Sequence, residues 1–447
     1  MESSHCHLRL ILTDSHTAHH DLNSLLHETL SMPKLSLNAS KKTKHTPAGE
    51  IPVDWGWSNL REIVESLESG VSVLTENRSA LRGEFGVLKV SAVRSGKFIS
   101  TENKSILPDQ LHRASTIPVK GSVIISRSNT LDLVGSVGLV TENHPSLFLP
   151  DTLWQIRFAE SAAIEPAWIN AVLSSDPYRL RLKTIASGTS ANMKKLQKPS
   201  LLKVPMPLPP LPEQRRIAGI LATWDRAIET LESLIAAKSR RKQALMQQLL
   251  SGKKRLPCFS EPWTVRHLGE VAENVSLRNN GKFSWDRLYA VTKADGMVPM
   301  REQVMGVTTN NCKLVKQNFF AYNPMRLNIG SLARWQRDEE VMVSGDYIVF
   351  RCKEGELEPR FFDHLRRTTQ WHDFVNVGGS GSVRVRLYFK DIAPFKFPCP
   401  EFKEQKALAD FFDTIDRELT LHRQHLDSLR TQKRGLMQKL LTGEVRT

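Results

Sequence analysis

Four polar segments of this sequence carry the residue types that contact nucleic acids. Each combines arginine, lysine or asparagine with small polar residues. Arginine can donate two parallel hydrogen bonds to guanine, asparagine can pair in the same way with adenine, and hydroxyls suit phosphates. Taken singly, each such residue is more often an ordinary surface or turn residue. As a group they are candidate DNA contacts: Arg127, Ser128, Asn129, Thr189, Asn192, Lys194 and Lys195 in the first half, and Asn323, Arg326, Asn328, Ser331, Arg334, Arg384 and Arg386 in the second.

Motifs for catalysis are absent from the sequence. There is no Gly-x4-Gly-Lys-Ser/Thr phosphate loop, no Gly-x-Gly-x-x-Gly, no His-Glu-x-x-His and no nuclease motif in which Pro-Asp is followed by Asp/Glu-x-Lys. Asn323-Pro324-Met325 comes nearest to the Asn/Asp-Pro-Pro-Tyr/Phe motif of amino-methyltransferases, but it lacks the stacking aromatic residue. Histidines gather in residues 1–48, but no helical i, i+4 pair beside a carboxylate lies there in a convincing metal-binding frame. We therefore expect no catalytic centre, metal or cofactor in this chain.

The charge balance indicates a polyanionic partner. The 447 residues carry a formal net charge of +15, and nucleic acid is the usual partner of such a chain. A merely basic soluble protein remains the alternative on charge alone. No apolar run reaches the roughly 20 residues that a membrane span needs. The five cysteines are scattered and never in Cys-x-x-Cys spacing, which favours a reducing cytoplasm over a disulfide framework or a zinc site.

An internal repeat organises the chain. The segment that begins Glu213-Gln214 returns as Glu404-Gln405, an offset of 191 residues, and the same offset pairs Gly252 with Gly443. It also pairs Leu245-Met246-Gln247 with Leu436-Met437-Gln438 and Asp225-Arg226 with Asp416-Arg417. A weaker match joins Trp55-x4-Leu60-Arg61-Glu62 to Trp263-x4-Leu268-Gly269-Glu270. A register held over this span indicates a duplication.

Each copy ends in a segment with the heptad pattern of a long helix. Apolar residues at the a and d positions predict a coiled-coil seam, with Gly252 and Gly443 placed to end the helices. Lys242 and Lys433 interrupt the seam at matching d positions; they either set the register or extend out of it to water. The helices are expected to pair antiparallel within one chain, with pairing between two molecules as the alternative. The predicted seam is Ile217, Leu221, Trp224, Ile228, Leu231, Ile235, Leu245, Leu249, Leu408, Phe412, Ile415, Leu419, Leu426, Leu429, Leu436 and Leu440.

Short apolar runs between turn residues predict strands in the rest of the chain, such as Ser122–Ile125, Val137–Val140 and Tyr347–Phe350. Helices are expected over Glu165–Leu182 and Pro359–Phe374. The fold class is therefore α+β: two mixed α/β domains and two long helices. The expected segments are an N-terminal extension without structure (1–49), a first domain (50–205), a first helix (206–255), a second domain (256–398) and a second helix (399–447).

Several of these motifs together resemble the specificity (S) subunits of type I restriction-modification systems. They are Pro207-Leu-Pro-Pro-Leu-Pro-Glu-Gln214 with its second copy, the helix ending Leu-Met-Gln-x-Leu-Leu-x-Gly, the Trp-x4-Leu-Gly-Glu motif and Ile125-Ser-Arg-Ser-Asn-Thr130. The resemblance covers residues 50–447. The leader of 48 residues is longer than the family usually has, and the Pro-rich stop before the second helix is weaker (Pro398-Cys399-Pro400).

The resemblance implies a subunit without a catalytic centre. Its two target-recognition domains would each read one half of a bipartite sequence in double-stranded DNA, and the coiled coil would fix the gap between the halves. Two methyltransferase (M) subunits and two motor-nuclease restriction (R) subunits would be its partners, and those partners would hold S-adenosylmethionine, ATP and Mg²⁺. The alternatives are a stand-alone two-headed DNA-binding regulator, a fused modifying enzyme and a purely structural coiled-coil protein.

Overall fold

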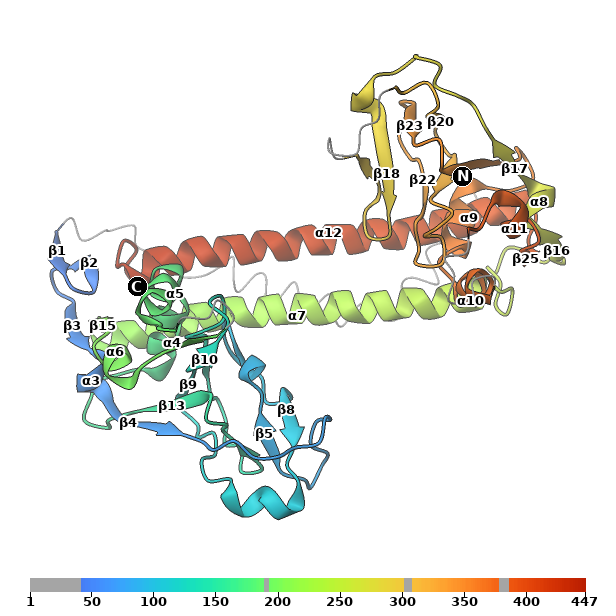
Figure 1. The fold of residues 1–447 in the computed structure, drawn as a ribbon. Helices are drawn as coiled ribbons and strands as arrows, with labels where there is room; N and C mark the ends of the chain where they lie inside the picture. The colour runs from blue at the N-terminus through green and yellow to red at the C-terminus, as the bar shows by residue number, and fades with distance from the viewer. Residues whose placement is uncertain (1–41, 189–192, 301–307, 378–385) are drawn as a thin grey trace. The chain divides into compact units, whose positions relative to one another are not determined.

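The computed structural model describes residues 42–188, 193–300, 308–377 and 386–447. These residues divide into two compact units. The first unit comprises residues 42–230 and 426–447, and the second comprises residues 231–425. Helices α7 (Leu211–Leu249) and α12 (Phe402–Leu441) are continuous (Figure 1), and each contributes one part to each unit. We call the rest of each unit its head.

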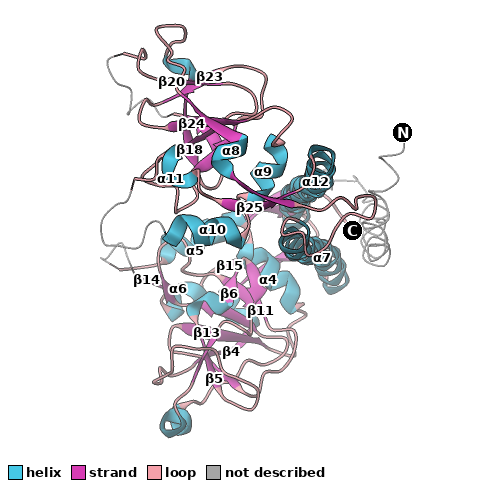
Figure 2. Ribbon diagram, turned by 90° about the vertical axis from the view of Figure 1, so that its right-hand side faces the viewer, coloured by secondary structure: helices cyan, strands magenta, loops and turns pink. Residues whose placement is uncertain are grey.

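The first head combines strands with short helices (Figure 2). Its main sheet has the order β4-β13-β9-β11-β7-β6, and a smaller sheet has the order β12-β5-β8. Three strand pairs, β1–β2, β3–β15 and β10–β14, lie outside these sheets. Its strands are β1 (Thr43–Thr46), β2 (Gly49–Pro52), β3 (Gly56–Asn59), β4 (Val64–Ser69), β5 (Gly86–Leu88), β6 (Val93–Arg94), β7 (Gly96–Phe98), β8 (Asn103–Ser105), β9 (Val123–Ser126), β10 (Ser128–Asn129), β11 (Val137–Leu139), β12 (Leu147–Phe148), β13 (Leu153–Phe158), β14 (Lys194–Lys195) and β15 (Pro205–Leu208), and its helices are α3 (Leu60–Ile63), α4 (Pro166–Ser174), α5 (Asp176–Ile185) and α6 (Lys198–Leu202).

The second head has two four-stranded sheets, with the orders β17-β24-β21-β22 and β19-β18-β23-β20, and a separate pair β16–β25. Its strands are β16 (Thr264–His267), β17 (Ala272–Val275), β18 (Leu288–Thr292), β19 (Gly296–Pro299), β20 (Lys313–Val315), β21 (Phe320–Tyr322), β22 (Leu332–Arg334), β23 (Val341–Val343), β24 (Ile348–Cys352) and β25 (Lys396–Cys399), and its helices are α8 (Leu268–Val271), α9 (Pro359–Leu365), α10 (Thr369–Val377) and α11 (Phe389–Ile392).

Four strands of each head are connected in the same way. In the first head β4, β9, β11 and β13 have the sheet order β4-β13-β9-β11, and in the second β17, β21, β22 and β24 have the order β17-β24-β21-β22. All neighbouring pairs in both sets are antiparallel. By position in these sheets, β22 of the second head corresponds to β11 of the first, and β24 corresponds to β13. Helix α4 follows β13 along the chain, and helix α9 follows β24. The two heads therefore share a structural frame.

In each head the sequence predicts one helix after this frame, and the structure has two. Helices α4 and α5 replace the first predicted helix, and α9 and α10 replace the second. The breaks fall at Ser175 and at residues 366–368. Ser175 donates its hydroxyl to the Val172 carbonyl over 2.7 Å, and Thr368 does the same to Leu365 over 2.7 Å. A hydroxyl that binds a carbonyl of the preceding turn competes with the helical hydrogen bond. Periodicity of apolar residues does not report this competition.

The N-terminal boundary also differs from expectation. Residues 43–46, assigned to an extension without structure, form strand β1 and pair with β2. Gly49, with a φ of +113°, makes the turn between them possible because it has no side chain. Residues 1–41 of that extension lie outside the described residues.

The long helices begin and end near the residues that the sequence predicts. Helix α7 begins at Leu211, with Pro212 in the first turn, where a missing N–H leaves no hydrogen bond unmade. Gly252 and Gly443, with φ of +73° and +71°, follow the helix ends in the left-handed conformation, as expected. Every residue of the predicted seam is buried or half-buried.

Each unit has one large core to which both long helices contribute. In the first unit, Ile217 and Leu221 of α7 and Leu440 of α12 join the core of the first head. In the second unit, Leu249 of α7 and Leu408 of α12 join the core of the second head. Each head is therefore packed against the start of one helix and the end of the other.

The lysines that interrupt the seam form ion pairs between the two helices. Lys433 lies 2.6 Å from Asp225 in the first unit, and Lys242 lies 2.5 Å from Asp416 in the second. The offset of 191 residues relates Asp225 to Asp416 and Lys242 to Lys433, so the two ion pairs are counterparts in the repeat. Of the two readings that the sequence left open, the structure favours the one in which these lysines define how the helices align.

The described residues hold neither a candidate membrane-spanning helix nor a candidate metal site. None of the helices there is long and apolar enough to cross a membrane. No group of three or more His, Cys, Asp or Glu side chains within the described ranges is placed to hold a metal ion.

Candidate nucleic-acid interface

The first head has two candidate segments, one around Arg127 and one around Lys194, and they lie side by side. Ser128 and Asn129 form strand β10 and pair with Lys195 and Lys194 of strand β14. Lys195 is exposed and Lys194 is half-buried, with its ammonium donating to the Gly188 carbonyl over 2.5 Å. The structure thus joins residues about 65 positions apart into one basic ribbon. Thr189 and Asn192 lie outside the described residues.

Arg127 precedes this ribbon and is half-buried. Its guanidinium lies over the ring of Trp154 at 5.5 Å from the centroid, and it donates from Nη1 to the Asp151 carbonyl over 3.2 Å. Its buried Nε has no hydrogen-bond partner within the described residues. Stacking on an indole orients a guanidinium while leaving donors at its edge for a ligand.

The second head places its first candidate segment at the corresponding position, directly after strand β21. Asn323 closes a turn by accepting a hydrogen bond from the Met325 N–H over 2.9 Å. Arg326 and Asn328 are exposed. Ser331 is buried and donates to the Val291 carbonyl over 3.0 Å, which directs its hydroxyl into the head rather than toward a ligand.

The second candidate segment of this head ends at Arg386, which is exposed, and Arg384 lies outside the described residues. Leu387, the next residue, donates its N–H to the Pro324 carbonyl over 3.0 Å. In the first head Leu196 donates in the same way to the Arg127 carbonyl over 2.8 Å. Both heads therefore share an equivalent backbone hydrogen bond between their two candidate segments, and in the first head the pairing of β10 with β14 adds to it.

Arg334 is placed differently from the other candidates. It lies on strand β22 with its side chain only 9% exposed. It donates from Nη1 to the Asn318 side chain over 2.7 Å, and its Nε is 3.8 Å from Asp363. It lines a cavity instead of joining the surface segments.

A buried acidic residue at the start of each long helix organises the junction with the head. Glu213 accepts hydrogen bonds from the Trp55 indole over 3.1 Å and from Arg446 over 2.7 Å. The second unit repeats this arrangement with Glu404, which accepts from Trp263 over 2.8 Å and from Arg255 over 2.6 Å. In both units the guanidinium also lies over the ring of the same tryptophan. We call each set of three residues a Trp–Glu–Arg junction.

The glutamine that follows each of these glutamates attaches the helix to the head. Gln214 accepts from the Glu165 N–H over 2.9 Å and donates to the Pro209 carbonyl over 2.9 Å. Gln405 accepts from the Glu358 N–H over 2.8 Å and donates to the Pro400 carbonyl over 2.9 Å. These contacts give the repeated Glu-Gln pair a structural role that the sequence did not reveal.

The sequence did carry a signal for the junctions. Extending the repeat three residues beyond Gly252 and Gly443 pairs Arg255 with Arg446 at the same offset. The Asp363 cluster around Arg334 has no such signal, because Arg334 and its partners come from different elements and are not repeated in the first head.

Comparison with known proteins supports the duplicated frame. The sequence model of the family described as type I restriction modification DNA specificity domain matches residues 52–237 and 260–431. The chain is 23% identical over 422 residues to a putative type I restriction enzyme MjaX specificity subunit of Methanocaldococcus jannaschii, covering 90% of this chain and 96% of that protein. It is 25% identical over 186 residues to the EcoEI specificity subunit of Escherichia coli, covering 41% of this chain and 31% of that protein.

Solved structures share the fold. The S subunit of a type I restriction-modification system from M. genitalium aligns with a TM-score of 0.54 and 16% identity, covering 88% of this chain and 96% of that one. A chain from a structure that describes complex assembly and conformational transition of the type I R-M system aligns with a TM-score of 0.51 and 19% identity, covering 88% of this chain and 99% of that one.

Proposed function

The chain belongs to the type I restriction-modification DNA specificity family, and from this premise we propose that it is a DNA-recognition subunit without a catalytic centre of its own. Each head reads one half of a bipartite target in double-stranded DNA. The observation that carries the proposal is the placement of the candidate segments: in both heads an equivalent backbone hydrogen bond joins them, Leu196 to Arg127 and Leu387 to Pro324.

The two heads read different sequences. The shared frame holds unlike side chains at corresponding places: Arg127 and Asn129 on a basic ribbon in the first head, and Asn323 and Arg326 on an exposed turn in the second. Arginine and asparagine are the side chains best suited to bidentate contacts with guanine and adenine. A common frame with different readers therefore supports a target made of two unlike halves.

Helices α7 and α12 act as an antiparallel coiled coil that fixes the gap between the half-sites. Within the first unit the start of α7 packs with the end of α12, and within the second unit the end of α7 packs with the start of α12. The ion pairs Lys433–Asp225 and Lys242–Asp416 support pairing inside one chain rather than between two molecules. The repeat and the coiled coil together let one polypeptide imitate a two-fold dimer.

The remaining activities belong to partner subunits. Two methyltransferase (M) subunits hold S-adenosylmethionine and modify the target, and two restriction (R) subunits use ATP and Mg²⁺ for translocation and cleavage. The complex works on DNA in the cytoplasm. Support comes from the family and from the lack of catalytic motifs in the sequence.

The test is to map methylated adenines in the host genome with the gene present, deleted and restored. We expect one bipartite motif to lose its methylation on deletion and to regain it on restoration, and we expect the chain to co-purify with a methyltransferase. Methylation that does not change on deletion, or methyl transfer by the purified chain alone, would contradict the proposal. Sequence-specific binding without a methyltransferase partner would instead indicate a stand-alone regulator.

A further inference from the structure

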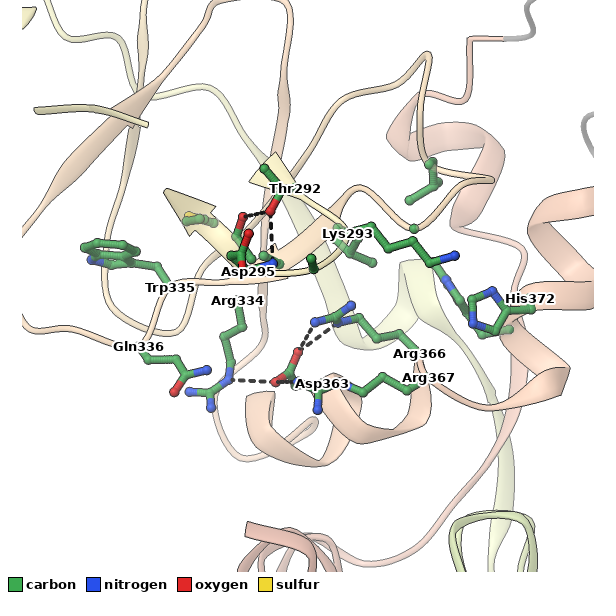
Figure 3. A pocket seen from close by; sticks show the side chains of 18 of the residues that line it. Thr292, Lys293, Asp295, Arg334, Trp335, Gln336, Asp363, Arg366, Arg367 and His372 are labelled. Carbon is green, nitrogen blue, oxygen red and sulfur yellow. Dashed lines mark hydrogen bonds and ion pairs between the residues drawn. The ribbon is translucent and has the colours of Figure 1, made fainter. Parts of the chain in front are cut away.

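A cavity of about 730 Å³ opens in the second head beside the candidate segment 323–331. Its wall is formed by the turn between strands β18 and β19, by strand β22 with the residues that follow it, and by helices α9 and α10 with the residues between them (Figure 3). Leu327 and Gly330 of the candidate segment form part of its wall. The cavity therefore adjoins the exposed turn that carries Arg326. We call it the arginine cavity.

One buried carboxylate serves three guanidinium groups in this cavity. Asp363, with 5% of its side chain exposed, lies 2.6 Å from Arg366 and 3.0 Å from Arg367. Arg334 Nε lies 3.8 Å from the same carboxylate. Figure 3 shows Arg334 and Arg366 approaching Asp363 from two sides of the cavity.

The carboxylate cannot balance all of this charge. Burial by itself would raise the pKa of Asp363, but the charges of Arg366, Arg367 and Arg334 hold that pKa at about 2, so the group is ionised. Arg367 has a second partner, Asp416, at 3.7 Å. Within the described residues, Arg334 and Arg366 have ion pairs with Asp363 alone. Two largely buried cations thus share one anion, which is unfavourable unless a further anion is supplied.

Arg334 also has an unsatisfied donor. Its side chain is 9% exposed, and its buried Nε has no hydrogen-bond partner within the described residues. A buried donor without a partner costs roughly 1–3 kcal/mol, and more when the group is charged. The exposed Lys293, whose stem passes over Gly330, adds another cation to the lining, and the exposed Asp295 adds a carboxylate.

The first head shows that this cavity is not a general property of the frame. Strand β11, the counterpart of β22, pairs there with strand β7, Gly138 opposite Gly96. Asn170 of helix α4 donates to the Gly96 carbonyl over 2.8 Å. Asn170 and Asp363 each lie five residues after the glutamate that precedes their helix. The first head therefore closes with a strand and an amide at the place where the second has a cavity and a charged cluster.

We propose that the arginine cavity is a phosphate-binding site of the second head. Guanidinium groups match the geometry of phosphate oxygens and bind them through paired hydrogen bonds. The cavity is large enough for a phosphate with its attached sugar, and the neighbouring exposed turn is placed to read the adjoining bases. The phosphate comes from the backbone of the second half-site or from a free nucleotide, and the experiment below separates these sources. A phosphate from the DNA backbone as the ligand rests on the proposed function.

The test measures binding of the full-length chain to duplex DNA over a range of salt concentrations. The variants are Arg334→Gln, which removes the guanidinium whose Nε lacks a hydrogen-bond partner, and Lys293→Gln, which changes an exposed residue of the cavity wall and leaves the core intact. Arg351→Gln is the matched control, since it removes an arginine of the same head that pairs with Glu273 outside the cavity. Isothermal titration with inorganic phosphate and with ATP forms a second arm.

If the ligand is a DNA phosphate, both cavity variants bind all duplexes roughly tenfold more weakly. The slope of log affinity against log salt also falls by about 0.9 for each lost phosphate contact, and Arg351→Gln matches the wild type. If the ligand is a free nucleotide, DNA binding is unchanged and the variants lose binding of inorganic phosphate or ATP. Either result supports a phosphate site.

Two results would overturn it. One is that the cavity variants match the wild type in both arms. The other is an altered base preference with an unchanged salt slope, which would make the cavity a base-reading pocket. If the wild-type chain itself shows no DNA recognition, the proposed function fails, whereas the titration with phosphate still decides the nature of the cavity.

Discussion

Arg446 donates from Nε to Glu213 over 2.7 Å and thereby joins residues 233 positions apart in the chain. The same guanidinium pairs with Asp54 over 2.6 Å and lies over the ring of Trp55, which itself donates to Glu213. The segment that follows α12 is thus a structural part of the first head. In the second unit Arg255, which follows α7, completes the second head through Glu404.

Replacement of Arg446 by alanine should destabilise the first unit. Glu213 is only 4% exposed in its side chain and would lose its cation, and breaking a buried ion pair costs about 3 kcal/mol. Urea unfolding combined with hydrogen exchange of the first head measures the loss. Lys439→Ala is the control, because Lys439 is 51% exposed on the last turn of the same helix and should change stability by less than about 0.5 kcal/mol. Equal effects of the two substitutions would refute the role of the junction.

Gly443→Ala should also destabilise the first unit. Gly443 has a φ of +71°, and a Cβ there would meet the Pro52 ring at 2.3 Å. The backbone strain alone costs about 1–2 kcal/mol. Gly435→Ala, in the interior of the same helix with open space around it, should stabilise by about 0.5–1 kcal/mol. Thermal unfolding should show a lower melting temperature for Gly443→Ala and a higher one for Gly435→Ala. Shifts of both melting temperatures in the same direction would contradict this account.

Reversing the charge of Lys433 or of Asp225 alone should lower the stability of the first unit, and reversing both charges together should restore it. Their side chains are 21% and 35% exposed and lie 2.6 Å apart. Lys433→Asp and Asp225→Lys each place like charges in contact, whereas the double variant recreates an ion pair. A double-mutant cycle in urea should give a coupling of about 1 kcal/mol. Additive losses would show that this pair does not contribute to helix alignment.

The second unit should lose stability on mild acidification through His364. Burial lowers the pKa of His364, while its hydrogen bond to Asp413 raises it; the charges of Lys242 and Arg367 lower it and that of Asp363 raises it. Asp416 also faces the ring, at 4.0 Å. Since the folded pKa lies below the unfolded value of about 6.5, the unfolded chain takes up the proton first.

The contribution of His364 is therefore complete above about pH 6.5 and falls as the pH drops toward the folded pKa. The lowered pKa of Asp413 acts separately, because its contribution is lost only below about pH 4. The free energy of unfolding, measured at about pH 8 and about pH 5.5, should fall more in the wild type than in His364→Gln. A parallel decrease in both proteins would exclude His364 as the source.

Arg127→Ala and Arg326→Ala should weaken recognition of different half-sites. Each removes a guanidinium from the candidate segments of one head, and a bidentate base contact contributes about 1–3 kcal/mol of discrimination. Binding to duplexes in which one half-site at a time is altered separates the effects, with Arg351→Gln as the control. If both substitutions changed the preference at the same bases, the model of two readers would be wrong.

The candidate segments illustrate how far sequence reasoning extends. Residue type and position between apolar runs were enough to select Arg127, Asn129 and Arg326, because turns and surface polarity are local properties. Their role in binding stays a prediction. That the two segments of each head meet, with Leu196 and Leu387 as donors, could not be foreseen, since backbone hydrogen bonds between residues far apart in the chain leave no periodic pattern.

Taken alone, the sequence determined the two long helices, the glycines that end them and several of the strands in the heads. These features depend on heptad spacing, alternation and backbone freedom, which act over a few residues. Only the tertiary structure decided that Arg446 completes the first head, that Ser175 and Thr368 break their helices, and that Arg334 shares Asp363 with Arg366. Such contacts depend on which buried groups need a partner, and burial is known only once the whole chain has packed.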